Sequence, residues 1–165
     1  MVGRRPQGRG NDADEYGVDS SRYTLSRYLS PFVPAALAKR AVVVSVSTDR
    51  DVYERGDPVE VTAEFKNRLP VPIELSTPSQ RRWGWSVDGF LEASDERLYT
   101  RSSPSTFRFR GGERKRVSFV WNGRLEYTRG RHESVRPEPG KHDIRVFVAT
   151  QGERDPSDTT TITLE

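Results

Sequence analysis

The sequence predicts an all-β protein: an antiparallel immunoglobulin-like β-sandwich of eight or nine short strands, preceded by a disordered N-terminal arm. Short apolar segments alternate with polar residues at a period of two, which is the pattern of a strand with one buried face. Turn residues recur about every 8–12 positions, as they do in sandwiches. No long segment shows the apolar repeat of an amphipathic helix. A closed β-barrel is the alternative that these observations leave open.

Length and composition indicate one domain with some length to spare. Of the 165 residues, 33% are hydrophobic and 31% are charged, so we expect a modest core beneath a heavily ionised surface. The absence of Cys excludes a disulfide framework and a thiolate metal site, and it favours a cytoplasmic location. No apolar run approaches the roughly 20 residues that span a bilayer, so no membrane partner is expected.

The N-terminal quarter of the chain differs from the rest. Residues 1–22 carry almost no apolar side chains, so we expect residues 1–40 to form a disordered or loosely docked arm. Residues 23–38 are richer in aromatic and aliphatic side chains, but Pro31 and Pro34 limit any helix to short pieces. We interpret this segment as a latch on the body; a short partner-binding motif is the alternative.

Charge is distributed unevenly between the arm and the body. Residues 1–40 hold seven basic and four acidic residues, a net charge of +3, whereas residues 41–165 hold 20 of each. A dedicated nucleic-acid-binding domain normally carries a basic excess on its folded part. The neutral body therefore argues against that class of protein.

Nine segments of the body have strand patterns. They are residues 42–47, 59–66, 71–75, 83–87, 90–99, 106–110, 117–121, 142–148 and 160–164. The clearest is residues 59–66, where every second residue is apolar. Residues 142–148 follow a Pro-Gly turn and place Ile144, Val146 and Val148 on one face, which requires a second sheet to cover it.

Glycine turns separate several of these segments. Asp88-Gly89 predicts a two-residue hairpin. Gly111-Gly112 is expected to join its flanking segments as a second, paired hairpin.

Five basic residues surround the Gly111-Gly112 turn: Arg108, Arg110, Arg114, Lys115 and Arg116. In a paired hairpin, Arg108 and Arg110 would share one face with Arg114 and Arg116, opposite the neighbouring Phe side chains. We interpret this face as a solvated surface that discourages pairing at a sheet edge. An anion-binding surface is the alternative.

The longest connection in the body, residues 124–138, is the surface expected to bind a protein partner. Long ordered loops on rigid sandwiches often carry binding residues, and Tyr and Arg commonly anchor protein interfaces. The candidate contact residues are Arg124, Leu125, Tyr127, Arg129, Arg131 and Arg136. A solvated loop without a partner is the alternative.

No group of residues predicts catalysis. The chain has two His and no Gly-x-Ser-x-Gly turn. His142 falls on the apolar face of its strand, so we interpret it as a core residue with one hydrogen bond. The acidic residues between positions 49 and 57 lack the Gly and the terminal Glu of an EF-hand loop. We therefore expect a protein that is not an enzyme and that needs neither a cofactor nor a metal.

The three Trp residues are most simply explained by packing. We expect Trp83, Trp85 and Trp121 to fill the core or the space between the sheets. A Trp pair exposed at the surface would instead indicate a platform for carbohydrate or peptide.

Several short motifs occur in an order known from one family. The motifs are Tyr53-x-x-Gly56-x-Pro58-Val59, a strand ending in Asn67, Asp88-Gly89, Gly112-Glu113 before a strand with a Trp, and Pro139-Gly140-x-x-x-Ile144-x-Val146. Over about residues 42–149 this order resembles the intracellular proteinase inhibitor family of BsuPI type. The resemblance implies an immunoglobulin-like fold and a proteinase as partner. His142 departs from it, because an aromatic residue is expected after the Pro-Gly turn.

The leading hypothesis is a cytoplasmic, non-catalytic β-sandwich that binds another protein, with proteinase inhibition implied by the resemblance. The alternative is an accessory protein that binds nucleic acid or another polyanion through the basic arm and the Arg-rich hairpin. Such binding would weaken steeply with salt.

Overall fold

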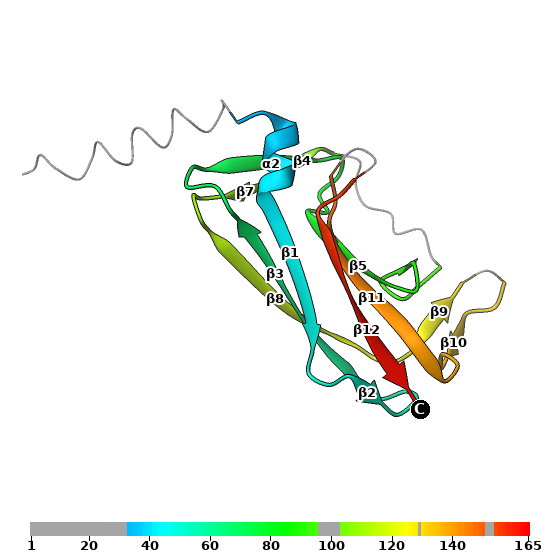
Figure 1. Cartoon of the computed structure of the whole chain (residues 1–165). Helices are drawn as coiled ribbons and strands as arrows, with labels where there is room; N and C mark the ends of the chain where they lie inside the picture. The colour runs from blue at the N-terminus through cyan, green and yellow to red at the C-terminus, as the bar shows by residue number, and fades with distance from the viewer. Residues whose placement is uncertain (1–32, 96–102, 129, 151–153) are drawn as a thin grey trace, which may run out of the picture.

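A computed structural model describes residues 33–95, 103–128, 130–150 and 154–165 (Figure 1). The elements are α2 (Ala35–Ala41), β1 (Val42–Thr48), β2 (Val52–Tyr53), β3 (Val59–Asn67), β4 (Ile73–Thr77), β5 (Trp83–Val87), β6 (Phe90–Leu91), β7 (Ser105–Phe109), β8 (Arg114–Trp121), β9 (Leu125–Tyr127), β10 (Glu133–Val135), β11 (Gly140–Val148) and β12 (Ser157–Leu164). The predicted all-β class is confirmed. The structure adds β2, β9 and β10 to the expected strands, while residues 98 and 99 lie outside the described residues.

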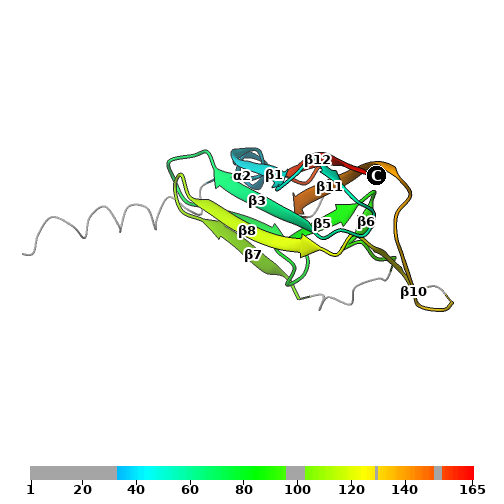
Figure 2. The ribbon, with the colours of Figure 1, turned by 90° about the horizontal axis from the view of Figure 1, so that it is seen from below.

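Two main sheets face each other and make the predicted sandwich (Figures 1 and 2). One has the strand order β1-β3-β8 and the other the order β2-β12-β11-β5-β6. Neighbouring strands are antiparallel, except for a short parallel pairing of β12 with β2. Two further pairs, β4–β7 and β9–β10, complete the described strands. The sheets stay separate, so the architecture is a sandwich and not a closed barrel.

The core lies between the central strands β3 and β11. Their inward side chains have no exposed surface: Val59, Val61, Ala63, Phe65, Ile144, Val146 and Val148. All seven follow the period-two pattern of the sequence, so the predicted buried faces are confirmed. Burying this apolar surface provides the main free energy of folding, at about 25 cal/mol per Å².

The two long sides of the sandwich differ. On one side β1 lies beside β12, and the Val46 N–H donates a 2.9 Å hydrogen bond to the Asp158 carboxylate. On the other side, within the described residues, β8 has no partner beyond β3, and β5 pairs with β6 only at Ser86 and Val87. Among the described residues, the sandwich is therefore closed along β1 and β12 and open along β5 and β8.

Helix α2 covers the end of the core next to β1 and β4. It begins after Pro34, whose carbonyl accepts the N–H groups of Leu37 and Ala38 at 2.9 Å. Ala38 and Ala41 are buried, and both belong to the same core cluster as residues of β4 and β7. Residues 1–32, most of the predicted arm, lie outside the described residues. No helix in the described part of the chain is long and apolar enough to cross a membrane.

Asn67, at the end of β3, holds two turns together. Its buried side-chain amide donates to the carbonyls of Val71 and Arg110, both at 2.8 Å, and its Oδ1 accepts the Leu69 N–H at 3.0 Å. The turn at Gly111 packs close behind, because a Cβ added to this glycine would lie 2.1 Å from the Pro70 carbonyl oxygen. Asn67 thus fixes the corner where the chain changes sheets.

The prediction of a paired hairpin at Gly111-Gly112 was wrong. Strand β7 pairs with β4, whereas β8 pairs with β3, so the two strands that flank the turn belong to different sheets. The physical reason is that β3 and β4 each bury an apolar face, and each takes a different neighbour to extend its sheet. The predicted hairpin at Asp88-Gly89 is present, and positive φ angles of 49° and 85° there fit the turn that such a pair favours.

Asp88 also connects its turn to β11. Its carboxylate accepts the Asp143 N–H at 2.9 Å and contacts His142 Nδ1 at 2.6 Å. His142 Nε2 donates to the Glu138 carbonyl at 2.7 Å. The side chain of His142 is 12% exposed. It makes two hydrogen bonds rather than the one expected, so both ring nitrogens serve the structure.

Replacing Asn67 by Asp tests the corner. The free energy of unfolding should fall by about 2–4 kcal/mol, because a buried carboxylate cannot donate hydrogen bonds to the two carbonyls. Urea unfolding measures the change. The matched control is Asn122→Asp, which is exposed and keeps an oxygen to accept the Arg124 N–H. Similar changes for the two variants would contradict the assigned role of Asn67.

Candidate functional site

The segment predicted to be a long binding loop, residues 124–138, contains a hairpin. Strands β9 and β10 pair in the register Leu125–Val135, Glu126–Ser134 and Tyr127–Glu133. The segment was expected to be one long loop, and the structure forms two short paired strands within it instead. Each strand has only three residues, which is too short for a clear alternating pattern in the sequence. Both ribbon views show this hairpin extending beyond the two main sheets (Figures 1 and 2).

The base of the hairpin is anchored in the core. Leu125 is 8% exposed and packs in the cluster that contains Trp121. The Trp121 indole N–H donates to the Arg124 carbonyl at 2.7 Å. The Arg124 guanidinium crosses to β10, where it donates to Ser134 Oγ at 2.6 Å and to the Ser134 carbonyl at 2.7 Å. Arg124 and Leu125 therefore hold the hairpin in place, and their contact with a partner stays a prediction.

A second set of contacts fixes the side of the hairpin. Asp95 Oδ1 accepts the N–H and the hydroxyl of Thr128, at 2.6 and 2.8 Å. Backbone bonds join Glu126 to Ala93 at 2.8 Å and Asp95 to Glu126 at 3.0 Å. The half-buried Tyr127 ring meets Phe90 edge-on, with 5.7 Å between ring centroids. Tyr127 is thus a packing residue on one face and accessible on the other.

The remaining candidates of the hairpin lie at its surface. Arg131 and Arg136 are exposed, as is Val135 at 40%. His132, which was not predicted as a contact, is 70% exposed and lies 3.6 Å from the Glu126 carboxylate. Arg129 lies outside the described residues. The hairpin therefore combines a fixed base with an exposed outer part that carries cationic and apolar side chains.

The five basic residues near Gly111 do not share one face. Arg114 and Arg116 lie on the exposed face of β8, whereas Lys115 points between the sheets, 5.5 Å from the Phe109 ring centroid. Carboxylates neutralise most of the charge. Arg108 pairs with Glu74 at 2.9 Å, Arg114 with Glu64 at 3.6 Å and Lys115 with Glu113 at 2.9 Å. Arg116 faces Glu64 across the β3–β8 ladder. The shared cationic face expected from a hairpin is absent from these residues because β7 and β8 are not paired.

Glu113 links this cluster to the corner. Its carboxylate accepts the Arg110 N–H at 2.6 Å and the Lys115 ammonium at 2.9 Å. These two donors, the backbone N–H first, hold the pKa of Glu113 below its ordinary value. The carboxylate therefore stays ionised at neutral pH and keeps Lys115 in position.

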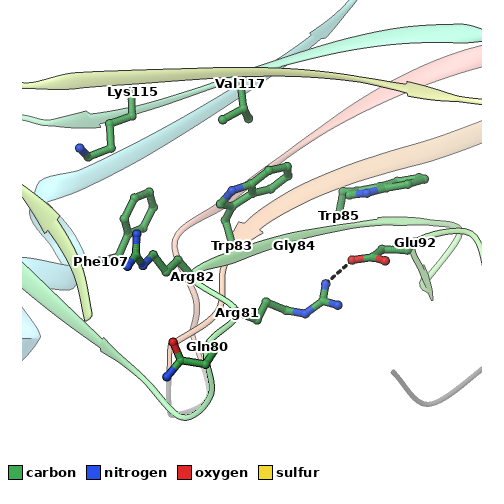
Figure 3. Close-up of a pocket in the computed structure, with 10 residues that line it drawn as sticks. All are labelled: Gln80, Arg81, Arg82, Trp83, Gly84, Trp85, Glu92, Phe107, Lys115 and Val117. Atoms are coloured by element: carbon green, nitrogen blue, oxygen red, sulfur yellow. Dashed lines mark hydrogen bonds and ion pairs between the residues drawn. The ribbon is translucent and has the colours of Figure 1, made fainter. Parts of the chain in front are cut away.

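A groove on the open side of the sandwich was not predicted from the sequence (Figure 3). Its volume is about 590 Å³, and it is lined by Gln80, Arg81, Arg82, Trp83, Gly84, Trp85, Glu92, Phe107, Lys115 and Val117. Trp83 and Trp85 are half-buried and pack on Phe119, at centroid distances of 6.0 and 4.7 Å. Their packing role was predicted, but their partial exposure was not. Arg81 and Arg82, directly before the two Trp residues, are the sequence signal that could have indicated this groove.

The acidic residues near position 49 serve a structural role. Asp49 accepts the Tyr53 hydroxyl at 2.6 Å and the Glu60 N–H at 3.1 Å. The hydroxyl bond lowers the pKa of Asp49, while burial and then the neighbouring carboxylate raise the pKa of Tyr53. Among the described residues, no three or more His, Cys, Asp or Glu come together in a way that could hold a metal ion.

Comparison with protein families identifies the chain. It belongs to a family of unknown function, DUF7974, whose model matches residues 30–165. The family match does not show a proteinase inhibitor family. No curated protein matches the sequence.

Several solved structures share a β-rich fold with the chain at low similarity. A β-glucosidase from Listeria innocua is 16% identical, with a TM-score of 0.44 over 74% of this chain and 16% of that one. The sporulation control protein Spo0M from Bacillus subtilis is 17% identical, with a TM-score of 0.46 over 76% and 49%. A CARDB domain from Pyrococcus furiosus is 15% identical, with a TM-score of 0.44 over 75% and 94%. The chain thus spans about a sixth of the β-glucosidase, and these likenesses assign no activity.

Replacing Glu113 by Gln tests the electrostatic account of the cluster. At about pH 7 the free energy of unfolding should fall by about 1 kcal/mol, because two charge-assisted hydrogen bonds weaken. Since the native pKa of Glu113 is depressed, this stabilisation is complete above the unfolded-state pKa of about 4.3 and is lost as the pH falls through the native pKa.

Urea unfolding between about pH 7 and about pH 3 measures this loss. The difference in the free energy of unfolding between the wild type and Glu113→Gln should become smaller as the pH falls. Glu133→Gln, an exposed carboxylate on β10, is the control and should change little at any pH. If Glu113→Gln lowers the free energy of unfolding by the same amount at every pH tested, the ionised Glu113 carboxylate is not the source of the stabilisation.

Proposed function

We propose that the protein is a non-catalytic binding module that presents the β9–β10 hairpin to another protein. One observation carries the proposal: the hairpin extends beyond the sandwich while its base is fixed by Leu125, Arg124 and Asp95. A segment that is already ordered loses little conformational freedom on binding, so more of the contact energy remains as affinity.

The side chains exposed on the hairpin favour a protein as the partner. Arg131 and Arg136 offer planar donors that suit carboxylates and carbonyls, and Val135 adds an apolar contact. Tyr127 can add the accessible part of its ring. The revised contact set is therefore Tyr127, Arg131, Val135 and Arg136.

A proteinase is the first class of partner to test. The motif order that resembles the BsuPI-type inhibitors supports this choice, and pre-organised segments are typical of inhibitors that bind proteinases. Binding of nucleic acid or another polyanion through the cationic cluster is the weaker alternative, because the carboxylates paired with Arg108, Arg114 and Lys115 would repel a continuous row of phosphates.

Site-specific crosslinking can identify the partner. A photoreactive residue placed at Val135 should capture a protein in a lysate of the source organism, because this position lies on the proposed surface. The same residue at Val120, which is 60% exposed on the outer face of β8, is the control and should not capture that protein.

Binding of the purified partner then tests the hairpin directly. Arg131→Glu should weaken binding at least about tenfold without lowering the melting temperature, since the Arg131 side chain is exposed. Lys141→Glu, an exposed cation on β11, should have little effect. If the partner is a proteinase, cleavage of a peptide substrate should be inhibited by the wild type and not by Arg131→Glu. Equal binding by both variants would reject the hairpin as the contact surface.

A further inference from the structure

We propose that the groove on the open side of the sandwich is a second binding site, which takes an extended acidic peptide segment. An apolar side chain of the peptide would pack on Trp83 and Phe107, and its carboxylates would bind Arg82 and Lys115. The site is separate from the hairpin and does not depend on the function proposed for it.

The apolar wall of the groove is rigid. Trp83 packs on Phe65 and on Phe119, both at 6.0 Å between ring centroids. The ring centroid of Phe107 lies 5.6 Å from that of Phe65 and 4.6 Å from that of Phe109. Because both rings are held from behind, the surface that they offer is formed before any ligand arrives. An aromatic or large aliphatic side chain would bury apolar area there without reordering the wall.

The polar part of the site is cationic. A neighbouring cavity of about 430 Å³ shares Arg82, Phe107 and Lys115 with the groove and adds Ser105, Thr106 and Arg108. None of these six lining residues is acidic. Arg82 is exposed and makes no ion pair with the described residues, so its guanidinium is open to a ligand (Figure 3).

The other two cations retain donors for a ligand. Lys115 meets Glu113 through an ammonium that has three N–H donors, and Arg108 meets Glu74 through Nε. Charge complementarity therefore requires carboxylates on the segment that occupies the site.

The backbone beside the groove suits an extended chain. The edge of β5 at Trp83 and Gly84 has no strand partner opposite β11 among the described residues, because β6 reaches only Ser86 and Val87. A peptide can add to such an edge through main-chain hydrogen bonds, while its alternate side chains point into the groove. The acidic and apolar side chains would then come from neighbouring positions of one strand.

A peptide fits the charges better than a nucleic acid does. Glu92 lies on the groove, paired with Arg81 at 2.6 Å, and Glu74 and Glu113 pair with Arg108 and Lys115, which line the cavity. These carboxylates would repel a continuous row of phosphates, and the body has no net positive charge to attract one. A peptide can place its few carboxylates at the cations alone.

A labelled peptide tests the proposal with the full-length chain. The probe is a peptide of about eight residues that alternates Phe with Asp or Glu, because a strand of about that length spans the site. Fluorescence anisotropy should show saturable binding, and the indole N–H signal of Trp83 in an NMR spectrum should shift. The Trp121 indole, which is bonded to the Arg124 carbonyl inside the core, should not shift. Arg82→Gln should weaken binding about three- to tenfold, and Lys141→Gln, the matched control, should not.

Three outcomes with other probes would each overturn the proposal. One is equal binding of a peptide with Asn and Gln in place of its acids, which would remove the role of the cations. Another is equal binding of a peptide with Ala in place of Phe, which would remove the role of the aromatic wall. The third is tighter, competing binding of an oligothymidylate, which would make the site one for nucleic acid. Absence of saturable binding by the Phe-containing acidic peptide would also overturn the proposal. Hairpin variants such as Arg131→Glu are a control and should bind this peptide as the wild type does.

Discussion

The packing of β3 against β11 holds the two main sheets together and positions the other elements. The inward side chains of both strands are completely buried, and they contribute to both core clusters of the sandwich. Every other element is placed relative to this pair. Strands β1 and β8 flank β3, strands β12 and β5 flank β11, and the end of α2 closes one end of the core. Loss of this contact would separate the sheets, so the surfaces described above all depend on it.

Two departures from a simple sandwich create those surfaces. The first departure is the corner at Asn67 and Gly111, after which β7 pairs with β4 and not with β8. The outer edge of β8 therefore stays unpaired among the described residues, and the groove forms on this side of the sandwich. At the second, the chain leaves β8 beneath the Trp121 indole and forms the hairpin before it returns as β11. Both surfaces thus rest on buried polar contacts at the ends of β3 and β8. This arrangement explains how a chain with a modest core can hold exposed cations and aromatic rings in fixed positions.

The sequence predicted the elements that are governed by local rules. Alternation located β3 and β11 with their buried faces, and Asp88-Gly89 located a hairpin, because both signals depend on neighbouring residues alone. It could not predict that Gly111-Gly112 joins two sheets, since that is decided by which distant strands β3 and β4 accept as neighbours. The anchoring of Arg124 by Ser134 and the meeting of Trp83, Phe107 and Lys115 were missed for the same reason. Candidate contact residues could be found by type, but their division into anchors and exposed residues required the structure.

Hydrogen exchange of the backbone amides can show whether the hairpin is a rigid extension of the sandwich. The Glu126 N–H is bonded to Ala93 and the Thr128 N–H to Asp95, whereas Gly130 lies exposed near the tip. If the hairpin is rigid, the amides of Glu126 and Thr128 should exchange far more slowly than that of Gly130 and at rates close to those of β3, because their exchange requires breaking the core contacts at the base of the hairpin. Exchange of all three amides at one fast rate would contradict it, since the hairpin would then be an ordinary mobile loop.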